Sequence, residues 1–385
     1  MSTVLVAHPS PDLYGSDRQL LETIRALVDA GHRVNVALPD DGPLLPELTA
    51  LGARVAIVPF TVLRKSLLSP RGLAGLAARS ASEVARLRAL IRADGADLLL
   101  VNTVTLPWWA PAGRAAGVPV LAHVHEAEDS QNLLVRAGLN APLLAASRVV
   151  VNSRAARDTL VRAQPLLARR TQVVHNGVPA PEAPPPPLRE RLPQATFHVA
   201  MVARLSPRKG VDVALDALGH LRDDGLNASL RVCGSVFPGY EWYEEELRER
   251  AARPDLAGHV ELLGYVHPTW PVLYEADAVV VPSRVEPFGN TAVEAMHAAR
   301  PLVASRVQGL AEVVTDGVTG LLVAPGSPRA LADALLSLAA GPERARVLAQ
   351  TARREAAERF GVERYRATMA RVVEDLLAQG AEAPA

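Results

Sequence analysis

The chain has 385 residues, more than one small hydrophobic core usually holds, so two domains are predicted. Hydrophobic residues make up 49% and charged residues 21%, the balance of a globular protein, and a formal net charge of zero argues against binding of nucleic acid through bulk charge. A single cysteine, Cys233, excludes an internal disulfide and a cysteine-rich metal site, and its segment LRVCG predicts a buried thiol.

The N-terminal segment MSTVLVAHPSPD has neither the basic region nor the long apolar stretch of a signal peptide, and no apolar run approaches membrane-spanning length. We therefore expect a cytoplasmic protein. Residues 1–180 hold 19 Lys+Arg against 14 Asp+Glu, and the remainder holds 22 against 27. A solvated surface explains the excess of basic residues in the first half, and so does peripheral contact with anionic lipid at the inner membrane face. The candidates for that contact are Arg64, Lys65, Arg154, Arg157 and Arg162.

The first half of the chain alternates between predicted strands and helices. TVLVAH is an apolar strand and PSPDLYGSD a loop, after which Leu20, Ile24 and Leu27 recur at helical spacing. Ser16 followed by Gln19 has the spacing of a capping box at the start of this helix. Strands that alternate with helices indicate a parallel sheet covered on both faces. The further strands are predicted at HRVNVALP, ARVAIVPF, ADLLLVN, PVLAHVH, RVVVNS and TQVVHN.

A proline-rich stretch, residues 181–195, predicts a stiff extended linker, because proline lacks the backbone donor that a helix or central strand needs. Strand–helix alternation resumes after it, with strands at FHVAMVAR, ASLRVCGS, HVELLGYV, ADAVVVPS, PLVASRV and GLLVAP. We expect a first α/β domain over residues 1–180, a second over residues 196–360, and a C-terminal helix with its tail over residues 361–385. Ligands of such domain pairs usually bind at the carboxyl ends of the strands.

The segment VEPFGNTAVEAMHAARP, residues 285–301, follows the apolar strand ADAVVVPS. Its helix is predicted to begin at Thr291, with Asn290 as the N-cap residue. Backbone N–H groups and partial positive charge at a helix N-terminus stabilise an anionic phosphate. Gly289 removes the side chain where a ligand approaches the backbone. The turn therefore predicts a phosphate site.

Two glutamates flank this turn. Glu294, one helical turn in, can bind vicinal hydroxyls, as an acidic residue does for a ribose in dinucleotide folds. Glu286, at the loop entrance, can accept hydrogen bonds from hydroxyls at the other end of a ligand. Two such acids beside a phosphate site indicate a nucleoside-diphosphate sugar. Capping and compensation of the helix dipole also explain Glu294, but they explain Glu286 poorly.

Two basic residues, Arg204 and Lys209, follow the strand FHVAMVA. The chain has two lysines, Lys65 and Lys209, against 39 arginines, so a lysine at this place suggests a point charge with a specific role, although chance also supplies one or two. Together the two side chains can neutralise a diphosphate leaving group.

These motifs resemble glycosyltransferase family 4, a family of retaining enzymes with the GT-B fold. The resemblance rests on EPFGNTAVE, with Glu286 and Glu294 at its ends, on ARLSPRKG at residues 203–210 and on SRVQGLAEVVTDGVTGLLV. YGSDRQLL, HVHE, VVVNSRAAR and VVHNGV are similar to the family's N-terminal domain, so the resemblance covers nearly the whole chain. It implies two Rossmann-like domains that face each other across a cleft, and a C-terminal helix that packs back on the first domain.

The resemblance also implies residue roles in the second domain. Arg204 and Lys209 hold the diphosphate, Glu294 binds the ribose, and Glu286 binds the hydroxyls of the donor sugar. One departure is Gln308, before Gly309, where many relatives have a second glycine. Backbone contacts to sugar and phosphate are implied for Phe288, Gly289, Asn290 and Thr291, and contacts to the base for Gly234, Tyr265 and Val266.

In the first domain, the resemblance implies that Gly15 closes over the diphosphate and that His125 lies beside the transferred sugar. His123 points to the same face of its strand, and the choice between the two histidines is open. Trp108 and Trp109 can stack on an acceptor sugar or pack in the interior. The implied catalytic residues are His125, Glu286, Arg204 and Lys209.

The implied reaction moves a hexose from a UDP- or GDP-linked sugar to a hydroxyl of a sugar, lipid-linked or small-molecule acceptor. Retention is compatible with attack on the face of the leaving group and with double displacement. We expect no cofactor. We also expect no metal ion, because the chain lacks the Asp-x-Asp motif with which the other main transferase fold bridges a diphosphate.

Other functions of similar folds make different demands. A dinucleotide-dependent dehydrogenase needs a Gly-x-Gly-x-x-Gly turn after a strand, and this chain has none. A hexose-nucleotide epimerase of the same fold would turn over the donor without an acceptor. A non-catalytic sugar-nucleotide-binding protein would release no nucleoside diphosphate.

Overall fold

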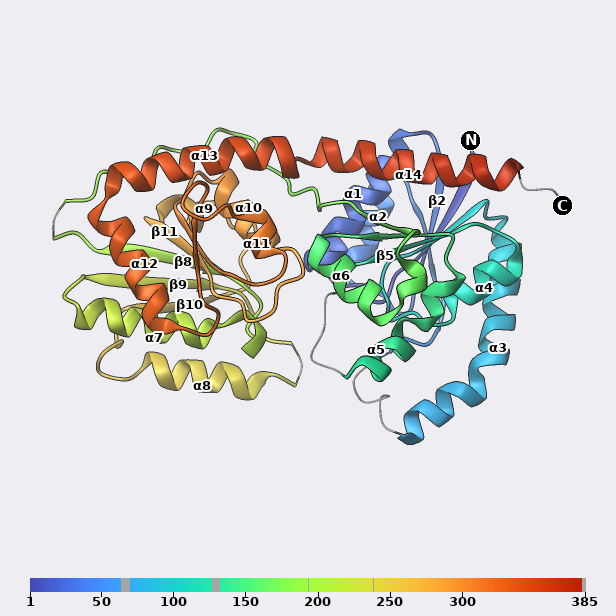
Figure 1. The fold of residues 1–385 in the computed structure, drawn as a ribbon, viewed down its shortest axis with the longest axis horizontal. Helices are drawn as coiled ribbons and strands as arrows, with labels where there is room; N and C mark the ends of the chain where they lie inside the picture. The colour runs from blue at the N-terminus through green and yellow to red at the C-terminus, as the bar shows by residue number, and fades with distance from the viewer. Residues whose placement is uncertain (64–69, 127–131, 193, 238, 383–385) are drawn as a thin grey trace. The chain divides into compact units, whose positions relative to one another are not determined.

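The computed structural model describes residues 1–63, 70–126, 132–192, 194–237 and 239–382. The chain divides into two compact units: unit 1 comprises Met1–Gly177 and the C-terminal segment from Val362, and unit 2 comprises Val178–Gly361. Figure 1 shows the helices and strands of both units. Each unit contains a parallel sheet with helices packed against it, which confirms the predicted α/β class.

Unit 1 is built on a seven-stranded sheet with the order β3-β2-β1-β4-β5-β6-β7. The strands β1, β4 and β5 are buried along their whole length, as expected of parallel strands that carry helices on both faces. Successive residues of β1 alternate between two hydrophobic clusters, one on each face of the sheet. The strands are β1 (Thr3–Ala7), β2 (Arg33–Leu38), β3 (Arg54–Ile57), β4 (Leu98–Val101), β5 (Val120–Val124), β6 (Arg148–Val151) and β7 (Thr171–Val173).

The C-terminal helix completes the core of unit 1. This helix, α14, lies against α1 (Figure 1), where Tyr365 Oη is 2.5 Å from Thr23 Oγ1 and Arg366 Nη2 is 2.5 Å from Glu22 Oε2. Its apolar side chains are buried in the cluster around β1. The resemblance implied this return of the C-terminal helix. The helices of unit 1 are α1 (Gly15–Asp29), α2 (Leu44–Ala50), α3 (Pro70–Asp94), α4 (Trp109–Ala116), α5 (Leu133–Asn140), α6 (Arg154–Ala163) and α14 (Val362–Glu382), with 3-10 helices η2 (Ala141–Ala145) and η3 (Pro165–Leu167).

The capping box of α1 differs from the predicted one. The helix begins at Gly15 with Tyr14 as its N-cap residue, and the Asp17 carboxylate accepts a hydrogen bond from the Tyr14 N–H at 2.8 Å. The prediction that Ser16 and Gln19 form the box is therefore wrong. The helix starts before Ser16, so that Gln19 already lies inside it and is buried.

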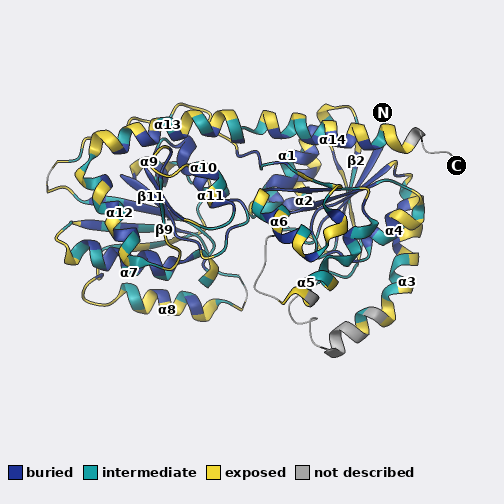
Figure 2. Cartoon of the chain, viewed as in Figure 1, coloured by how far each residue is buried: buried dark blue, intermediate teal, exposed yellow. Residues whose placement is uncertain are grey.

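Unit 2 is built on a six-stranded sheet with the order β10-β9-β8-β11-β12-β13. Its inner strands are largely buried, as Figure 2 shows, and Cys233 at the end of β9 is buried as predicted. Burial raises the pKa of the Cys233 thiol to about 11. The strands are β8 (Phe197–Val202), β9 (Ala228–Cys233), β10 (Val260–Gly264), β11 (Ala278–Val281), β12 (Leu302–Ser305) and β13 (Leu321–Val323). The helices are α7 (Val211–Asp223), α8 (Glu241–Ala251), α9 (Trp270–Glu275), α10 (Asn290–His297), α11 (Leu310–Val313), α12 (Pro328–Ala340) and α13 (Pro342–Phe360), with the 3-10 helix η4 (Pro207–Lys209).

Both sheets reverse their strand order beside the first strand of the unit. In unit 1, β1 lies between β2 and β4, and in unit 2, β8 lies between β9 and β11. Open α/β sheets bind ligands at such a switch point, at the carboxyl ends of the strands. Residues that follow β1, β4 and β5 in unit 1, and β8, β9 and β11 in unit 2, are therefore the expected site residues.

The proline-rich segment, residues 181–195, lies within unit 2 and does not join the two units. The chain passes from unit 1 to unit 2 at Gly177–Val178 and returns at Gly361–Val362. The buried Arg300 donates hydrogen bonds from both terminal nitrogens to Pro186 O, at 3.1 and 3.2 Å. Residues 181–192 form neither helix nor strand, and the buried Arg300 side chain holds this segment along unit 2.

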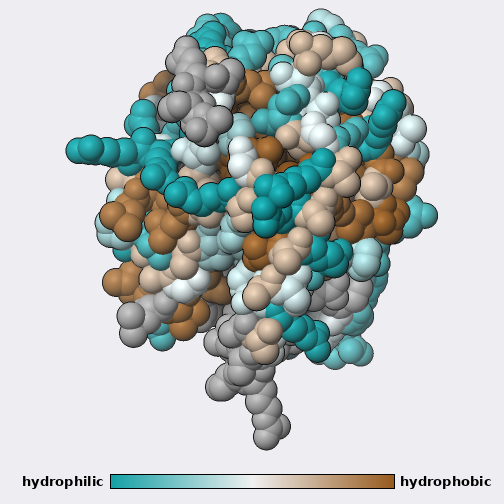
Figure 3. Space-filling view, turned by 90° about the vertical axis from the view of Figure 1, so that its right-hand side faces the viewer, coloured by the Kyte–Doolittle hydropathy of each residue, from teal (hydrophilic) through white to brown (hydrophobic). Residues whose placement is uncertain are grey.

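Within the described part of the chain, no helix is both long and apolar enough to cross a membrane. Of the basic candidates for lipid contact, Arg64 and Lys65 lie outside the described residues. On α6, Arg157 lies 3.6 Å from Asp158, and Arg162 donates to the Asp158 carbonyl at 3.2 Å. On the face that Figure 3 shows, hydrophobic patches are separated by hydrophilic residues. Peripheral membrane contact stays a prediction.

Candidate active site

The predicted donor-site residues of unit 2 follow neighbouring strands at its switch point. Arg204 and Lys209 follow β8, Gly234 follows β9, and Glu286 follows β11. Because β8 pairs in parallel with both β9 and β11, the carboxyl ends of these strands lie at one edge of the sheet. Residues from three separate motifs therefore meet at the edge where ligands of open α/β sheets bind.

A tight turn after β8 carries the basic residues. Pro207–Lys209 form η4, and Gly210 follows with a left-handed φ of 70° as the N-cap of α7. A Cβ on Gly210 would lie 2.2 Å from Pro282 O, at the end of β11, so only glycine lets the two loops approach this closely. Arg284, in the loop after β11, donates from Nη1 to Pro207 O at 2.8 Å and so holds the turn.

Asp212, near the start of α7, holds the Arg284 side chain in place. Two guanidinium nitrogens donate to its two carboxylate oxygens at 2.8 and 2.7 Å, and Tyr243 Oη donates to Asp212 Oδ1 at 2.8 Å. Partial burial of Asp212 opposes its ionisation, but the bonds from Arg284 and Tyr243 outweigh burial and lower the pKa of this carboxyl. These three residues were not predicted from the sequence, because only the fold brings them together.

Lys209 and Glu286 form an ion pair at the switch point. Lys209 Nζ lies 2.5 Å from Glu286 Oε2, and Ser283 Oγ donates to the same oxygen at 3.2 Å. The Lys209 side chain is 27% exposed and that of Glu286 is 12% exposed, so water screens this pair less than a surface pair. Two residues predicted from separate motifs are thus in direct contact.

The segment in which the chain departs from the family holds the backbone of Glu286. Gln308 Oε1 accepts a hydrogen bond from the Glu286 N–H at 3.0 Å, and the Gly309 N–H donates to Glu286 O at 3.0 Å. Gln308 has a φ of 33°, a region in which glycine is the usual residue. Gly309 has no space for a side chain, because a Cβ would lie 2.2 Å from Pro287 O. The departure therefore supplies an amide that positions the glutamate loop.

Helix α10 begins at Asn290, one residue earlier than predicted, and Gly289 is its N-cap residue. The prediction that Asn290 caps the helix is wrong, because the cap position has a φ of 109° and packs closely against Leu310. A Cβ on Gly289 would lie 2.5 Å from Leu310 Cδ2. Thr291 and Glu294 are half-buried in the first two turns of the helix.

The residues implied for the base pocket lie at the ends of β9 and β10. The Gly234 N–H donates to Gly264 O at 2.7 Å, and a Cβ on Gly234 would lie 1.7 Å from Ala203 O. Glycine is therefore required where the β9 loop crosses the backbone that leads to the basic turn. Tyr265, which is 57% exposed, and Val266 follow β10 directly.

Two aromatic contacts locate further predicted residues. Arg204 Cζ lies 3.5 Å from the centroid of the Phe237 ring, a cation–π contact that directs the guanidinium toward the β9 loop. The Phe288 ring is buried 5.6 Å from the Phe360 ring, so its side chain belongs to the core and only its backbone is placed for a ligand.

In unit 1, the structure distinguishes the two candidate histidines. Their rings lie side by side, with centroids 4.0 Å apart, but His123 is fully buried and stacks near Tyr365 of α14. His125, at the end of β5, is half-buried and its Nε2 lies 3.1 Å from Asn102 Oδ1. Burial and the neighbouring His8 lower the pKa of His125 to about 4, against the opposing charge of Asp17. His125 is therefore neutral near pH 7.

Several polar residues around His125 were absent from the sequence prediction. Glu126 Oε2 accepts from the His125 N–H at 3.0 Å, and its Oε1 accepts from Thr103 Oγ1 at 2.5 Å. Burial raises the pKa of the Glu126 carboxyl. One sequence pattern could have predicted this cluster. His8, Asn102 and His125 each follow directly after an apolar strand. Gly15, the first residue of α1, begins the helix whose first turn also faces this cluster through Asp17.

The two tryptophans differ in burial. Trp109 is buried and its ring meets Phe60 edge-on at 5.3 Å, so packing accounts for it. Trp108 is half-buried and also packs against the unit 1 core.

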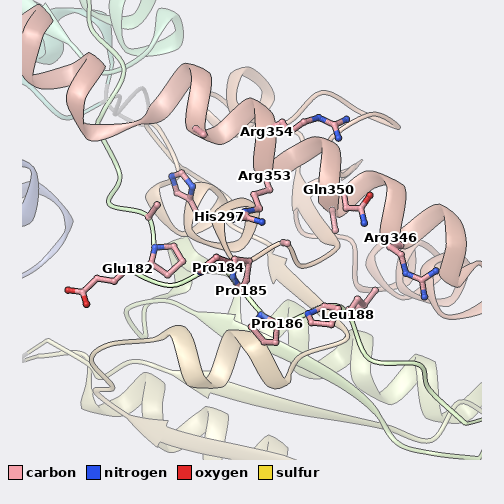
Figure 4. A pocket seen from close by; sticks show the side chains of 16 residues that line it. Glu182, Pro184, Pro185, Pro186, Leu188, His297, Arg346, Gln350, Arg353 and Arg354 are labelled. Atoms are coloured by element: carbon pink, nitrogen blue, oxygen red, sulfur yellow. The ribbon is translucent and has the colours of Figure 1, made fainter.

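A cavity of about 620 Å³ in unit 2 lies away from these residues, between the proline-rich segment and α13. Figure 4 shows Arg346, Gln350, Arg353 and His297 on one wall and the prolines on the other. None of the predicted site residues lines it. Among the residues that the structure describes, no group of three or more His, Cys, Asp or Glu side chains is arranged to hold a metal ion.

Solved structures identify the class of the fold. The Anabaena protein HepE, whose structure was determined in complex with UDP and glucose, superposes with a TM-score of 0.81 at 24% identity, over 97% of this chain and 100% of that one. Sucrose-phosphate synthase of Thermosynechococcus elongatus superposes with a TM-score of 0.76 at 22% identity, over 98% of this chain and 100% of that one. The two α/β units therefore have the fold of GT-B glycosyltransferases, as predicted.

Family models and curated relatives identify the family. Residues 14–182 match Glycosyltransferase Family 4 and residues 189–355 match Glycosyl transferases group 1. Glycogen synthase of Mycobacterium tuberculosis is 35% identical over 195 residues, which are 49% of this chain and 44% of that protein, so the matched region spans less than half of this relative. D-inositol 3-phosphate glycosyltransferase 1 of Catenulispora acidiphila is 28% identical over 380 residues, 90% of this chain and 87% of that protein. The chain belongs to glycosyltransferase family 4, as the motifs predicted.

Proposed function

We propose that this protein is a retaining hexosyltransferase that moves a sugar from a nucleoside diphosphate to an acceptor hydroxyl. The observation that carries the proposal is the ion pair of Lys209 and Glu286 at the switch point of unit 2, close to the start of α10. Lys209 is the proposed cation for the diphosphate, and Glu286 is the proposed acceptor for the sugar hydroxyls. Their contact would place these two groups on either side of the sugar–phosphate bond that such an enzyme breaks.

In the proposed donor complex, Arg204, Lys209 and the N-terminus of α10 stabilise the negative charge that develops on the departing diphosphate. Glu286 accepts hydrogen bonds from the sugar, and Glu294 accepts them from the ribose. In the protein without ligand, Glu286 neutralises Lys209 at 2.5 Å. A bound diphosphate would share the ammonium group with Glu286, so donor binding would not leave either charge unpaired.

The proposed reaction breaks the bond between sugar C1 and the diphosphate oxygen and forms a bond between C1 and the acceptor oxygen on the same face. The proton of the acceptor hydroxyl passes to the departing diphosphate. No protein nucleophile is needed in this scheme. The product then has the anomeric configuration of the donor, and comparing the anomeric proton couplings of donor and product by NMR tests this point.

For the donor, we propose a UDP-linked hexose as the first candidate and a GDP-linked one as the second. The solved structure of HepE with UDP and glucose supports this order, and Gly234, Tyr265 and Val266 are the proposed contacts to the base. We also propose that transfer needs no metal ion, because the chain has no Asp-x-Asp motif. Full activity in the presence of excess EDTA is the expected result.

The first experiment is a thermal-shift panel with UDP, GDP, ADP, dTDP and their common sugar conjugates. A ligand at 100 times its Kd should stabilise the protein by about 2.7 kcal/mol, which is readily measured. We expect the nucleotides of one base to stabilise the protein. In a separate assay we expect release of the nucleoside diphosphate only when an acceptor is added. Conversion of the donor without an acceptor would indicate an epimerase, and a panel without any shift would refute the donor site.

A further inference from the structure

Four side chains form a continuous chain of hydrogen bonds at the switch point of unit 1. Asp17 Oδ1 lies 2.8 Å from His8 Nε2, His8 Nδ1 lies 3.0 Å from Asn102 Nδ2, and Asn102 Oδ1 lies 3.1 Å from His125 Nε2. Asp17, His8 and Asn102 are almost completely buried, with exposed fractions of 2%, 0% and 1%. They come from α1 and from the ends of β1 and β4, and only His125 at the end of β5 is half-buried.

The donors and acceptors in this chain can be assigned from its first member. The Asp17 carboxylate only accepts, so His8 Nε2 carries a proton and donates to it. Asn102 presents its amide nitrogen Nδ2 to His8 Nδ1, and because an amide nitrogen only donates, Nδ1 is the acceptor in this bond. The Asn102 oxygen is thereby directed to His125 and accepts from Nε2–H. The lone pair of the neutral His125 must therefore be on Nδ1.

We propose that Asp17, His8 and Asn102 are positioning residues that set the tautomer of His125, so that Nδ1 is the acceptor presented to the donor sugar. Within the described residues, Nδ1 of His125 has no hydrogen-bond partner. An acceptor at this position selects a sugar that has a hydroxyl group opposite it. The role of His125 toward the sugar rests on the proposed function, whereas its tautomer does not.

The surrounding groups favour the neutral imidazole on which this assignment depends. His8 and Asp17 face His125 from β1 and α1, and His123 and Glu126 are its neighbours on β5 and beyond it. Burial is the largest influence and lowers the pKa of His125. The Asp17 carboxylate opposes this shift without outweighing it, and burial also lowers the pKa of His123 and raises that of Glu126.

Asp17→Asn provides a test at the opposite end of this hydrogen-bond chain from His125. Asp17 Oδ2 accepts from the Tyr14 N–H at 2.8 Å, and a backbone N–H can only donate. The asparagine must therefore keep its oxygen toward Tyr14 and turn its amide toward His8 Nε2. His8 then takes the opposite tautomer, the Asn102 amide reverses, and Nδ1 of His125 becomes the protonated nitrogen. The variant leaves every residue that would touch the sugar unchanged.

The measurement is the imidazole 15N spectrum of the full chain labelled with 15N-histidine, with His125 assigned through His125→Gln. In the wild type we expect a protonated Nε2 and an unprotonated Nδ1, and in Asp17→Asn the reverse. Asp94→Asn is the matched control, since Asp94 accepts from Asn35 in the same unit but outside this chain. A protonated Nδ1 in the wild type, or an unchanged His125 in a folded Asp17→Asn, would overturn the proposal.

Asn102 variants provide a second test if Asp17→Asn does not fold. Asn102→Asp keeps an acceptor for His125 Nε2–H, so the tautomer should be retained and the pKa of His125 should rise. Asn102→Ala removes the acceptor, so the two tautomers should exchange. Identical His125 spectra in Asn102→Ala and the wild type would also refute the role of Asn102.

Kinetics separate this proposal from the proposed function. If both are correct, Asp17→Asn lowers kcat/KM for transfer about tenfold, the effect of one neutral hydrogen bond, and leaves binding of the nucleoside diphosphate to unit 2 unchanged. A wild-type protein with the expected tautomer but no transfer activity would refute the function and keep the tautomer assignment. A reversed tautomer with unaltered transfer would refute the contact between Nδ1 and the sugar.

Discussion

Glu286 illustrates how a single residue is fixed for a proposed role. Lys209 and Ser283 bind its carboxylate, and Gln308 binds its backbone N–H. These partners come from the loops after β8, β11 and β12, so the carboxylate can keep one orientation without ligand. An oriented acceptor costs little reorganisation when a sugar hydroxyl arrives, which is the condition for effective stabilisation in the transition state.

Glu286→Gln should separate nucleotide binding from transfer. The amide keeps the shape but not the charge, so transfer should fall about 10- to 100-fold, the range for loss of a hydrogen bond to a charged group. In this variant no carboxylate competes for the Lys209 ammonium group. The nucleoside diphosphate should therefore bind equally well or more tightly. Calorimetry and a transfer assay measure the two effects. Glu275→Gln, which alters a surface pair with Arg231, is the control. Equal loss of binding and transfer would contradict the assigned role.

The depressed pKa of His125 predicts a dependence of stability on pH. Its folded pKa of about 4 lies below the ordinary value of 6.5, so the folded state binds fewer protons than the unfolded state between these values. The contribution is complete above pH 6.5 and is lost as the pH falls toward 4, by up to about 3 kcal/mol. Urea unfolding at pH 7.5 and 5.0 measures the loss. The raised pKa of Glu126 has the opposite effect on stability, so the wild type should be compared with His125→Gln. We expect the unfolding free energy of His125→Gln to depend less on pH. An unchanged pH dependence would argue against the lowered pKa of His125.

At the scale of elements, the site in unit 2 depends on loops that approach closely. Gly210 permits the loop after β8 to meet the end of β11, and Gly234 permits the loop after β9 to cross the segment that leads to Arg204. Arg284 and Asp212 then fasten the basic turn to α7. The strands provide a common edge, and these contacts determine where the charged side chains stand on it.

The two glycines that flank α7 provide a matched pair of variants. Gly210 has a φ of 70° and no space for a Cβ, whereas Gly225 has a φ of 86° and open space around it. Gly225→Ala should cost about 1 kcal/mol of unfolding free energy, the strain of the left-handed conformation alone. Gly210→Ala should cost clearly more and should also weaken binding of the nucleoside diphosphate, because Lys209 must move. Urea midpoints and calorimetry measure both, and equal effects of the two variants would show that crowding at Pro282 is unimportant.

At the scale of the whole molecule, unit 1 is not a continuous stretch of chain. The chain leaves it after Gly177 and returns at Val362, and α14 then buries Met369, Val373 and Leu376 in the core around β1. A segment that ends before α14 would expose this part of the core to water. The first unit can therefore reach its folded state only after the last helix has been synthesised.

Met369→Ala should destabilise unit 1 selectively. Met369 is fully buried, so truncation should cost roughly 2–5 kcal/mol, the range for large-to-small changes in a core. Hydrogen exchange should accelerate in β1, β2 and β4, whereas β8 and β11 in unit 2 keep their protection. Val347→Ala on the exposed side of α13 is the control. The same loss of protection in both units would contradict the independence of the two cores.

The α/β class, the two repeated units and the residues of the donor motifs could be predicted from the amino-acid pattern alone. Those features are local, because strand and helix periods, the spacing of Glu286 and Glu294 and the pair of Arg204 and Lys209 are each contained in one short segment. Residue roles inferred from these motifs stay predictions until a ligand is bound.

The contacts between distant side chains depend on how the folded chain packs, and no sequence pattern predicted them. Three sets of contacts join segments that follow different strands. They are the ion pair of Lys209 with Glu286, the hydrogen bond from the Glu286 N–H to Gln308, and the hydrogen-bond chain from Asp17 to His125. The strand order, with β1 between β2 and β4 and β8 between β9 and β11, creates these contacts. Periodicity records which face of a strand is buried but carries no information about which strand becomes its neighbour, and for this reason the positioning residues could not be read from the sequence.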